Sequence, residues 1–245
     1  MRYELSRRAF DVRRILAIQI AILAVCVVAV GELALHFPFP SPLIKPVLSP
    51  RLRFPTAQVE AWVDSGDIDR DFMAFFSRDP DRIVPPGNNI VSPSDGVVQD
   101  IPTQDGTTYL VVGLSFWDVH VIRSPVEGIV KDITEEGLTL LRHPSADYLK
   151  QSIFLKGKPA PVQQIITLDT EHGEIKVRLI TSYFASRLKT WVHIGQRLTT
   201  GERLGRIVLG STVVTEFPGS PNLSVQTGTR VVGGETIILQ DRKSP

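Results

Sequence analysis

The chain has 245 residues, of which 42% are hydrophobic and 22% are charged, and its formal net charge is +1. This length allows one sizeable core with a small additional segment. The near-neutral charge and the lack of a basic run exclude a nucleic-acid-binding surface as the main function. The single cysteine, Cys26, excludes an intramolecular disulfide framework and a cysteine-based metal cluster. Eighteen glycines and eighteen prolines predict a turn-rich, mainly β protein.

Residues 1–37 are predicted to form an N-terminal membrane anchor. Residues 15–31 carry no charge, and beyond Glu32 the apolar run continues to Phe37. A helix of this length can cross a bilayer. Four arginines precede the run: Arg7, Arg8, Arg13 and Arg14. A cleaved signal peptide is the alternative, but the run is longer than the usual apolar core of such a signal, so an uncleaved anchor is favoured.

Residues 38–84 are predicted to be a linker followed by a short amphipathic helix. The linker, 38–58, is rich in proline, whereas residues 59–76 have helical spacing. Three aromatic side chains fall on one face of that helix: Phe72, Phe75 and Phe76. They either pack onto the protein's own core or rest on a lipid surface.

Two motifs each occur twice in residues 85–245, which are predicted to form one β-rich domain. An S-P-x-[DE]-G turn begins the segment 92–101 and recurs in 124–133. A V-x-x-G-x-x-[VL]-x-x-G-E segment covers 192–202 and recurs at 225–235. Because each is a turn followed by short apolar segments, a duplicated β unit is predicted. The segments resemble the barrel-sandwich hybrid fold of biotinyl and lipoyl domains.

That resemblance leaves a non-enzymatic alternative open, a membrane-anchored adaptor with a biotinyl- or lipoyl-like domain. Such adaptors usually insert a long coiled-coil hairpin between the two halves of the domain. Between residues 128 and 192 there are strand-like runs at 137–141 and 175–181 but no sustained heptads. A fold likeness alone identifies no activity.

Three residues form a candidate acid–base–nucleophile set: Asp95, His120 and Ser211. His120 lies in an alternating segment that predicts a strand shared with Asp118. His120 would activate the Ser211 hydroxyl, and Asp95 would fix the imidazole tautomer. The alternative is a structural histidine and a polar step within a strand. No metal site is predicted, because the other histidines have no His or Cys partner at ligand spacing: His36, His143, His172 and His193.

Five segments in order between residues 72 and 212 resemble the phosphatidylserine decarboxylase family. They are 72–78 with Arg82, 92–96, 118–125, 185–192 and 201–212. Each is weak alone, but their common order is specific. The resemblance implies a carboxy-lyase made as a proenzyme that cuts itself between Gly210 and Ser211, with Asp95 and His120 as the other members of the self-processing triad. Cleavage would give chains 1–210 and 211–245, which remain associated.

The resemblance also implies the chemistry. Attack of the Ser211 hydroxyl on the preceding carbonyl, an N-to-O acyl shift, elimination and loss of ammonia leave a covalent pyruvoyl group, so the cofactor is pyruvate derived from Ser211. Phosphatidylserine in the membrane would form a Schiff base with it, lose CO2 and leave as phosphatidylethanolamine. His120 would return the proton. Arg123 and Arg187 are candidate partners of the lipid phosphate, with solvated strand-end charges as the alternative. A homodimer is left open.

The chain departs from the family pattern, and its membrane topology is ambiguous. Trp117 stands where many members have a second histidine, and residues 163–165 read Gln-Gln-Ile where Asn-Glu-Arg is common. The arginines before the span predict export of the residues that follow, whereas the resemblance implies the cytoplasmic face, with basic linker residues near anionic lipid: Lys45, Arg51 and Arg53. We expect the cytoplasmic face; a re-entrant hairpin would reconcile both.

Overall fold

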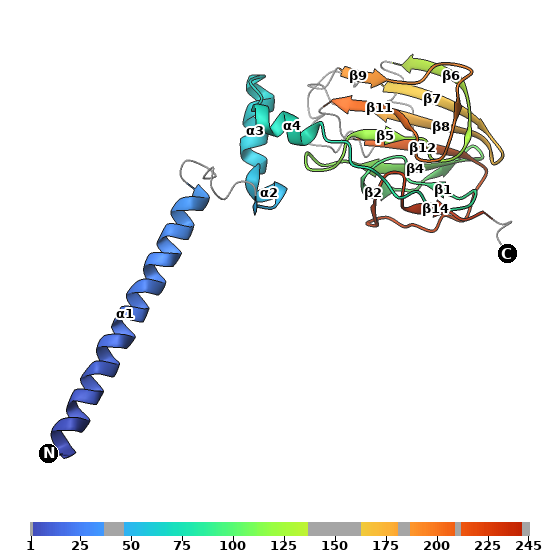
Figure 1. Ribbon diagram of the computed structural model, residues 1–245. Coiled ribbons are helices and arrows are strands. Elements are labelled where there is room, and N and C mark those ends of the chain that lie inside the picture. The colour runs from blue at the N-terminus through green and yellow to red at the C-terminus, as the bar shows by residue number, and fades with distance from the viewer. Residues whose placement is uncertain (1, 37–46, 137–162, 181–186, 209–211, 242–245) are drawn as a thin grey trace. The chain divides into compact units, whose positions relative to one another are not determined.

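The computed structural model describes residues 2–36, 47–136, 163–180, 187–208 and 212–241 (Figure 1). Within these ranges the side chains of residues 2–13, 34–36, 136 and 187 are not described. The chain divides into two compact units, Met1–Gln58 and Val59–Pro245. Each unit is therefore considered by itself.

The first unit contains the long helix α1 (Arg2–His36) and the short helix α2 (Pro50–Arg53). Within α1, residues Arg14–Leu33 have a mean hydropathy of 2.5, and their side chains are exposed. Twenty helical residues span about 30 Å, close to the thickness of the bilayer's hydrocarbon core. The predicted N-terminal helix, long and apolar enough to cross a membrane, is therefore present.

Two helices replace the single predicted helix over residues 59–76. α3 (Thr56–Ser65) ends before Gly66, which has a φ of +75°, and α4 (Arg70–Phe76) begins after Asp69, whose carboxylate accepts a hydrogen bond from Phe72 N at 2.8 Å. A left-handed glycine stops one helix, and the aspartate caps the next. The prediction of one continuous helix was wrong because it overlooked these two signals.

The aromatic residues of α4 pack into the second unit. Phe72 and Phe76 are buried, whereas Phe75 is half-buried. The Trp62 and Phe76 rings contact that of Phe72, with centroids 5.8 Å and 5.9 Å away. Of the two predicted roles, packing onto the protein's own core is confirmed for Phe72 and Phe76, and the lipid-surface alternative is wrong for them.

The rest of the second unit is built from antiparallel strands, fourteen of them in the described part of the chain. They are β1 (Ile90–Val91), β2 (Gly96–Asp100), β3 (Thr103–Gln104), β4 (Thr107–Gly113), β5 (Val121–Arg123), β6 (Gly128–Glu136), β7 (Gln163–Thr170), β8 (Gly173–Ile180), β9 (Arg187–Thr190), β10 (Arg197–Leu198), β11 (Arg203–Val208), β12 (Thr212–Pro218), β13 (Arg230–Val231) and β14 (Ile237–Leu239). The strand predicted at 175–181 is confirmed as β8, while 137–141 lies outside the described residues.

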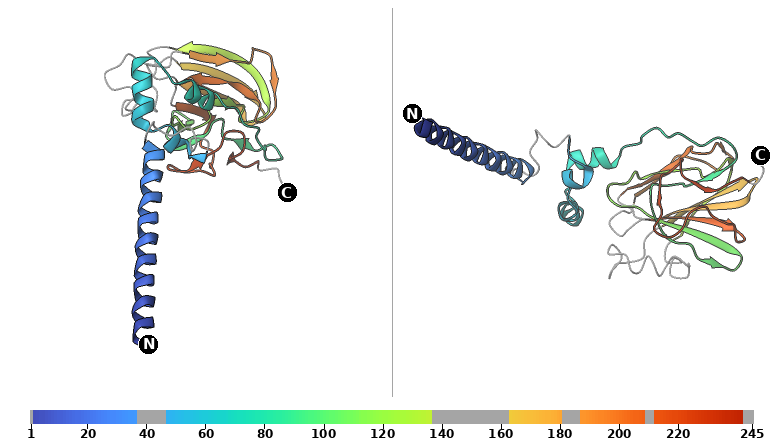
Figure 2. Two further views of the ribbon diagram at one scale, coloured as in Figure 1. Left: turned by 60° about the vertical axis from the view of Figure 1, so that its left-hand side comes forward. Right: turned by 90° about the horizontal axis from the view of Figure 1, so that it is seen from below.

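The strands form three sheets. A nine-stranded sheet has the order β10-β6-β7-β8-β12-β4-β2-β13, with β3 beside β4; a three-stranded sheet has the order β5-β11-β9, and β1 pairs with β14. One apolar cluster takes residues from both larger sheets, among them Ile122 of β5, Ile207 of β11 and Val213 of β12. The same strands can be followed from two other sides in Figure 2. The mainly β domain is thus confirmed, and its assignment as a barrel-sandwich hybrid stays a prediction.

The duplicated motifs pair with each other through equivalent backbone hydrogen bonds. In the first copy Val98 N donates to Thr229 O at 2.9 Å, and Gly228 N donates to Val98 O at 2.8 Å. In the second copy Val130 exchanges the same two bonds with Gln196 and Gly195, at 2.9 Å and 2.8 Å. The segment 92–101 therefore pairs with 225–235 in the same way as the segment 124–133 pairs with 192–202.

The two turns also bind each other reciprocally. Val91 N donates to Pro125 O, and Arg123 N donates to Pro93 O, both at 2.8 Å. Val91 and Arg123 precede their respective turns at equivalent positions, as Pro93 and Pro125 occupy equivalent positions within them. The two copies thus make equivalent backbone hydrogen bonds, as a duplicated β unit predicts.

Candidate active site

Asp95 lies in the first S-P-x-[DE]-G turn, which requires its glycine. The hydroxyl of the buried Ser92 donates to Ser94 O at 2.8 Å. Gly96 has a φ of +146°, and a Cβ at this position would lie 2.4 Å from Gly113 O. Only glycine tolerates both the backbone angle and the close approach. The turn therefore fixes the position of Asp95, the residue immediately before β2.

The Asp95 carboxylate is held by two segments that are far apart in sequence. Arg82 Nη2 donates to Oδ1 at 2.8 Å and to Oδ2 at 3.0 Å, and Gly233 N donates to Oδ1 at 2.9 Å. Arg82 follows α4, and Gly233 follows β13. Residues on both sides of the predicted cleavage position thus orient the carboxylate.

His120 is buried at the end of a turn that precedes β5. Asp118 N donates to Ser115 O at 3.0 Å, which closes the turn, and the imidazole Nδ1 lies 3.0 Å from Asp118 O. The Phe76 ring lies against the imidazole, with centroids 4.0 Å apart. The predicted strand through Asp118 and His120 was wrong, because β5 begins only at Val121.

This geometry selects one tautomer of His120. A carbonyl oxygen only accepts hydrogen bonds, so Nδ1 carries the hydrogen that Asp118 O receives. In the neutral imidazole the lone pair then lies on Nε2, which is able to take a proton. The tautomer-fixing role predicted for Asp95 is filled here by a main-chain carbonyl, since the Asp95 carboxylate binds Arg82 and Gly233. A role for Asp95 in self-processing stays a prediction.

Gly210 and Ser211 lie outside the described residues, but both flanks of their segment are described. β11 ends at Val208 in the three-stranded sheet, and β12 begins at Thr212 in the nine-stranded sheet. Ile207 N donates to His120 O at 3.1 Å. The backbone of His120 is therefore bonded to the strand that leads into the predicted cleavage position, and the next strand belongs to another sheet.

The segment from the last residue of α4 to Arg82 contacts two of the three predicted catalytic residues, His120 and Asp95. Phe76 lies on His120 and Arg82 binds Asp95, while Arg78 Nη2 donates to Trp117 O at 2.5 Å. Burial lowers the pKa of Arg78, and the charge of Asp95 opposes this shift. In the sequence, this segment was identified from the helical spacing of Phe76 and from the family resemblance. Its contacts with His120 and Asp95 were missed, because helical spacing and charge do not indicate which distant turn a residue meets.

The two predicted phosphate-binding arginines differ in what is described. The Arg123 side chain is buried: Nη2 donates to Asp79 Oδ1 at 2.6 Å and to Pro80 O at 3.1 Å, and Nη1 donates to Gly201 O at 3.1 Å. Burial lowers its pKa, and Asp79 opposes this. The alternative of a solvated strand-end charge is therefore wrong for Arg123. For Arg187 only the backbone is described, paired with Val208. Phosphate binding by either stays a prediction.

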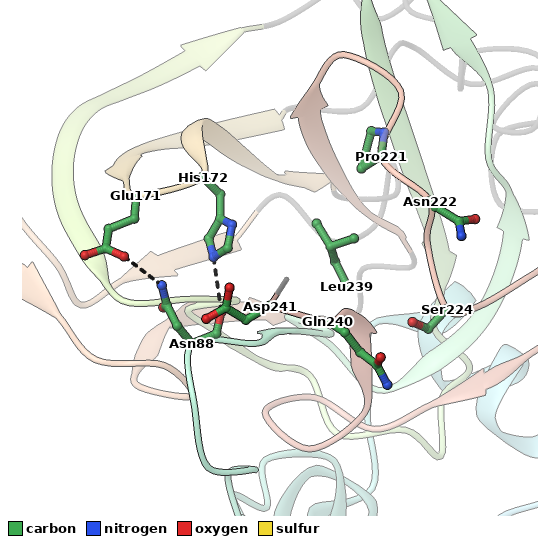
Figure 3. Close-up of a pocket in the computed structure, with 9 residues that line it drawn as sticks. All are labelled: Asn88, Glu171, His172, Pro221, Asn222, Ser224, Leu239, Gln240 and Asp241. Carbon is green, nitrogen blue, oxygen red and sulfur yellow. Dashed lines mark hydrogen bonds between the residues drawn. The ribbon is translucent and has the colours of Figure 1, made fainter. Parts of the chain in front are cut away.

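Two pockets, of about 490 Å³ and 550 Å³, lie away from these residues. The first is lined by Glu171 and His172 of the β7–β8 turn and by residues that follow β12 (Figure 3). Its polar groups are engaged with each other: Asn88 Nδ2 donates to Glu171 Oε2 at 3.0 Å, and His172 Nε2 lies 3.1 Å from Asn88 O. Asp95, His120 and Arg123 are not among the residues that line this pocket.

Known proteins are similar to this chain in sequence. The model of the family described as phosphatidylserine decarboxylase matches residues 70–239. A phosphatidylserine decarboxylase proenzyme of Thermobifida fusca is 35% identical over 170 residues, which cover 69% of this chain and 73% of the relative. One of Chlorobaculum tepidum is 32% identical, covering 69% and 77%. A protein of Methanococcoides burtonii, provisionally named archaetidylserine decarboxylase proenzyme, is 30% identical, covering 70% and 76%.

Proposed function

The chain belongs to the phosphatidylserine decarboxylase family, and from this we propose that it converts phosphatidylserine into phosphatidylethanolamine and CO2. The observation that carries the proposal is the environment of His120. It is buried, it donates from Nδ1 to a carbonyl, and its own carbonyl is bonded to Ile207, three residues before Gly210. A buried base whose backbone is bonded to the strand that leads into a Gly–Ser step suits a proenzyme that activates itself.

We propose that the chain first acts on its own backbone. Nε2 of His120 takes the hydroxyl proton of Ser211 as the oxygen attacks the carbonyl carbon of Gly210, and the acyl group moves from nitrogen to oxygen. Elimination of the α-proton and the ester oxygen of residue 211 releases the carboxylate of Gly210 and leaves a dehydroalanine. A water molecule hydrolyses the imine tautomer of this residue, which releases ammonia and places the water oxygen in the ketone of a pyruvoyl group at residue 211. Asp95, held by Arg82 and Gly233, contributes its negative charge to this self-processing.

The described residues on either side of positions 209–211 suit a pyruvoyl group at residue 211. When present, a pyruvoyl group supplies an electron sink for the carbanion that decarboxylation leaves. The chain itself has three tasks: β11 and β12 hold the two flanks, Phe76 shields one face of the His120 imidazole from water, and Nε2 returns a proton to the substrate carbon.

The two chains of the cleaved protein are expected to remain together. After a cut before Ser211, β12 would stay paired with β4 and β8, β13 with β2, and β14 with β1. These pairings tie the C-terminal chain to the rest of the second unit through backbone hydrogen bonds. A homodimer stays a prediction.

We further propose that α1 anchors the enzyme in the membrane that supplies its substrate. Its apolar stretch has the length for one span. We keep the cytoplasmic face as the proposed location of the second unit, with the basic linker near anionic lipid. Protease protection of the second unit in sealed inside-out vesicles tests the side: digestion supports the cytoplasmic face, and protection contradicts it.

Intact mass of the full-length protein tests the function. Wild type should give two chains, 1–210 and 211–245, the smaller blocked at its N-terminus, and should release CO2 from phosphatidylserine in vesicles. Ser211→Ala should stay uncut and inactive. The matched control is Ser220→Ala, which alters the exposed Ser220 of the Gly219–Ser220 step and should leave cleavage unchanged. A single full-length wild-type chain without CO2 release would instead support the membrane-anchored adaptor.

A further inference from the structure

Asp118 is a buried carboxylate for which the proposed mechanism has no use. Its Oδ2 accepts from Ser115 N at 2.6 Å and from Ser115 Oγ at 2.7 Å, and its Oδ1 accepts from Arg230. The residue is only 2% exposed. Burying a charge costs several kcal/mol unless it is paired and hydrogen-bonded, so these three bonds determine how Asp118 sits.

The same residue holds His120 through its backbone. Asp118 O accepts from His120 Nδ1 at 3.0 Å, and Asp118 N donates to Ser115 O at 3.0 Å. Side chain and backbone of Asp118 both bind Ser115, so the turn is closed twice. The direction of the Asp118 carbonyl, and with it the tautomer and ring orientation of His120, therefore depends on the carboxylate contacts.

Arg230 connects the C-terminal segment to the Asp118 turn through its bond to the Asp118 carboxylate. It lies in β13, where it pairs with Val97 of β2, and it follows the cleavage position. Its side chain is 55% exposed, whereas that of Asp118 is 1% exposed. An exposed arginine thus neutralises a buried carboxylate from the far side of the proposed cut. Removing it leaves the carboxylate buried without its cation.

We propose that Asp118 is the positioning residue of His120 and that Arg230 makes this positioning depend on the C-terminal segment. The proposal rests on the proposed function in taking His120 as the base. In this proposal Asp118 acts only through the carbonyl that receives the Nδ1 hydrogen. When Nε2 takes a proton the imidazole becomes a cation, and the bond from Nδ1 to this carbonyl becomes charge-assisted. The C-terminal segment must then dock β13 before His120 is competent.

The first test compares self-cleavage rates in full-length protein. Arg230→Met should slow cleavage at least about tenfold, a part of the ~10²–10⁴-fold that a positioned base contributes. Arg230→Lys, which keeps the charge, should recover the rate to within about threefold. The matched control is Arg197→Met, at the equivalent position of the other motif copy, where Arg197 pairs with the exposed Glu127. It should cleave like wild type. Equal rates for Arg230→Met and Arg197→Met would contradict the proposal.

The second test reads the tautomer directly and needs no activity. In the uncleaved Ser211→Ala protein in detergent micelles, side-chain ¹⁵N spectra of the histidines should show Nδ1 of His120 protonated, with His120→Gln identifying the signal. Adding Arg230→Met should shift this signal toward a mixture of tautomers, and Arg230→Lys should restore it. An unchanged His120 signal in Arg230→Met would overturn the proposal even if cleavage slows.

The two tests separate this inference from the proposed function. Uncut wild-type protein would contradict the proposed function, while the tautomer measurement would still decide whether Asp118 and Arg230 position His120. Normal cleavage of wild type together with an unaffected Arg230→Met would contradict only the positioning. A thermal unfolding midpoint for each variant accompanies both tests, and recovery by Arg230→Lys at an unchanged midpoint supports positioning over loss of structure.

Discussion

The two S-P-x-[DE]-G turns have the same backbone arrangement but opposite surroundings. In both, a buried serine hydroxyl donates to the carbonyl two residues on, at 2.8 Å for Ser92 and 2.7 Å for Ser124. The acidic residue that follows differs: the Asp95 side chain is 13% exposed, whereas that of Glu127 is 57% exposed. A duplicated scaffold thus presents one carboxylate to the interior and one to water.

What surrounds each turn explains the difference. Arg82, from the segment after α4, covers Asp95, and Gly233 approaches it closely enough for its N–H to bond. A Cβ at Gly233 would lie 3.0 Å from the Cα of Ser94, and the equivalent position of the other copy is Thr200. The candidate site therefore arises from additions to one copy and not from the repeated unit itself.

Replacing the acidic residue of each turn, Asp95 or Glu127, by its amide should give the largest difference in self-cleavage rate. Asp95→Asn removes the carboxylate charge that Arg82 and Gly233 hold in place, and we expect self-cleavage to slow about 10²-fold or more. Glu127→Gln, the equivalent change in the other turn, should cleave like wild type because its carboxylate is exposed. Intact mass over time after synthesis measures both. Equal rates in the two variants would remove the functional distinction between the turns.

Replacing the glycine of each turn, Gly96 or Gly128, should show how similar the steric constraints on the two backbones are. Gly96→Ala forces a Cβ to 2.4 Å from Gly113 O at a φ of +146°, and should lower the free energy of unfolding by about 3 kcal/mol or more. Gly128→Ala places a Cβ 2.7 Å from Asp169 O, and should cost about 1–3 kcal/mol. Urea unfolding of uncleaved Ser211→Ala protein measures both. A neutral Gly96→Ala would contradict the steric argument.

The two serines should give the smallest effects, and the most similar. Ser92→Ala and Ser124→Ala each remove one buried hydrogen bond to a backbone carbonyl, so each should lower the free energy of unfolding by about 1 kcal/mol. The same urea experiment measures them. A difference of more than about 1 kcal/mol between the two would mean that the turns are less equivalent than their hydrogen bonds indicate.

The comparison also separates what could be predicted from sequence. The apolar length of α1, the glycine- and proline-rich turns and the ordered family segments are local patterns, and they predicted the long apolar helix, the mainly β domain and the family. The bond between Asp118 and Arg230 joins residues 112 positions apart, and no spacing rule connects them. The tautomer of His120 depends on a carbonyl direction that only the folded turn defines. The break between α3 and α4 could have been predicted, because a glycine such as Gly66 commonly ends a helix and an aspartate such as Asp69 commonly caps the start of the next one.

If the chain is cut before Ser211 as proposed, the place of β12 in its sheet would limit the lifetime of the cleaved protein. β12 lies between β4 and β8, inside the nine-stranded sheet, and it begins one residue after Ser211. In the uncut chain, β12 is covalently joined to β11, so both strands fold as parts of one molecule. Once the link is cut, a β12 that leaves has to find its neighbours as a separate molecule at low concentration. The persistence of the mature protein therefore depends on how slowly it unfolds and not on its ability to refold.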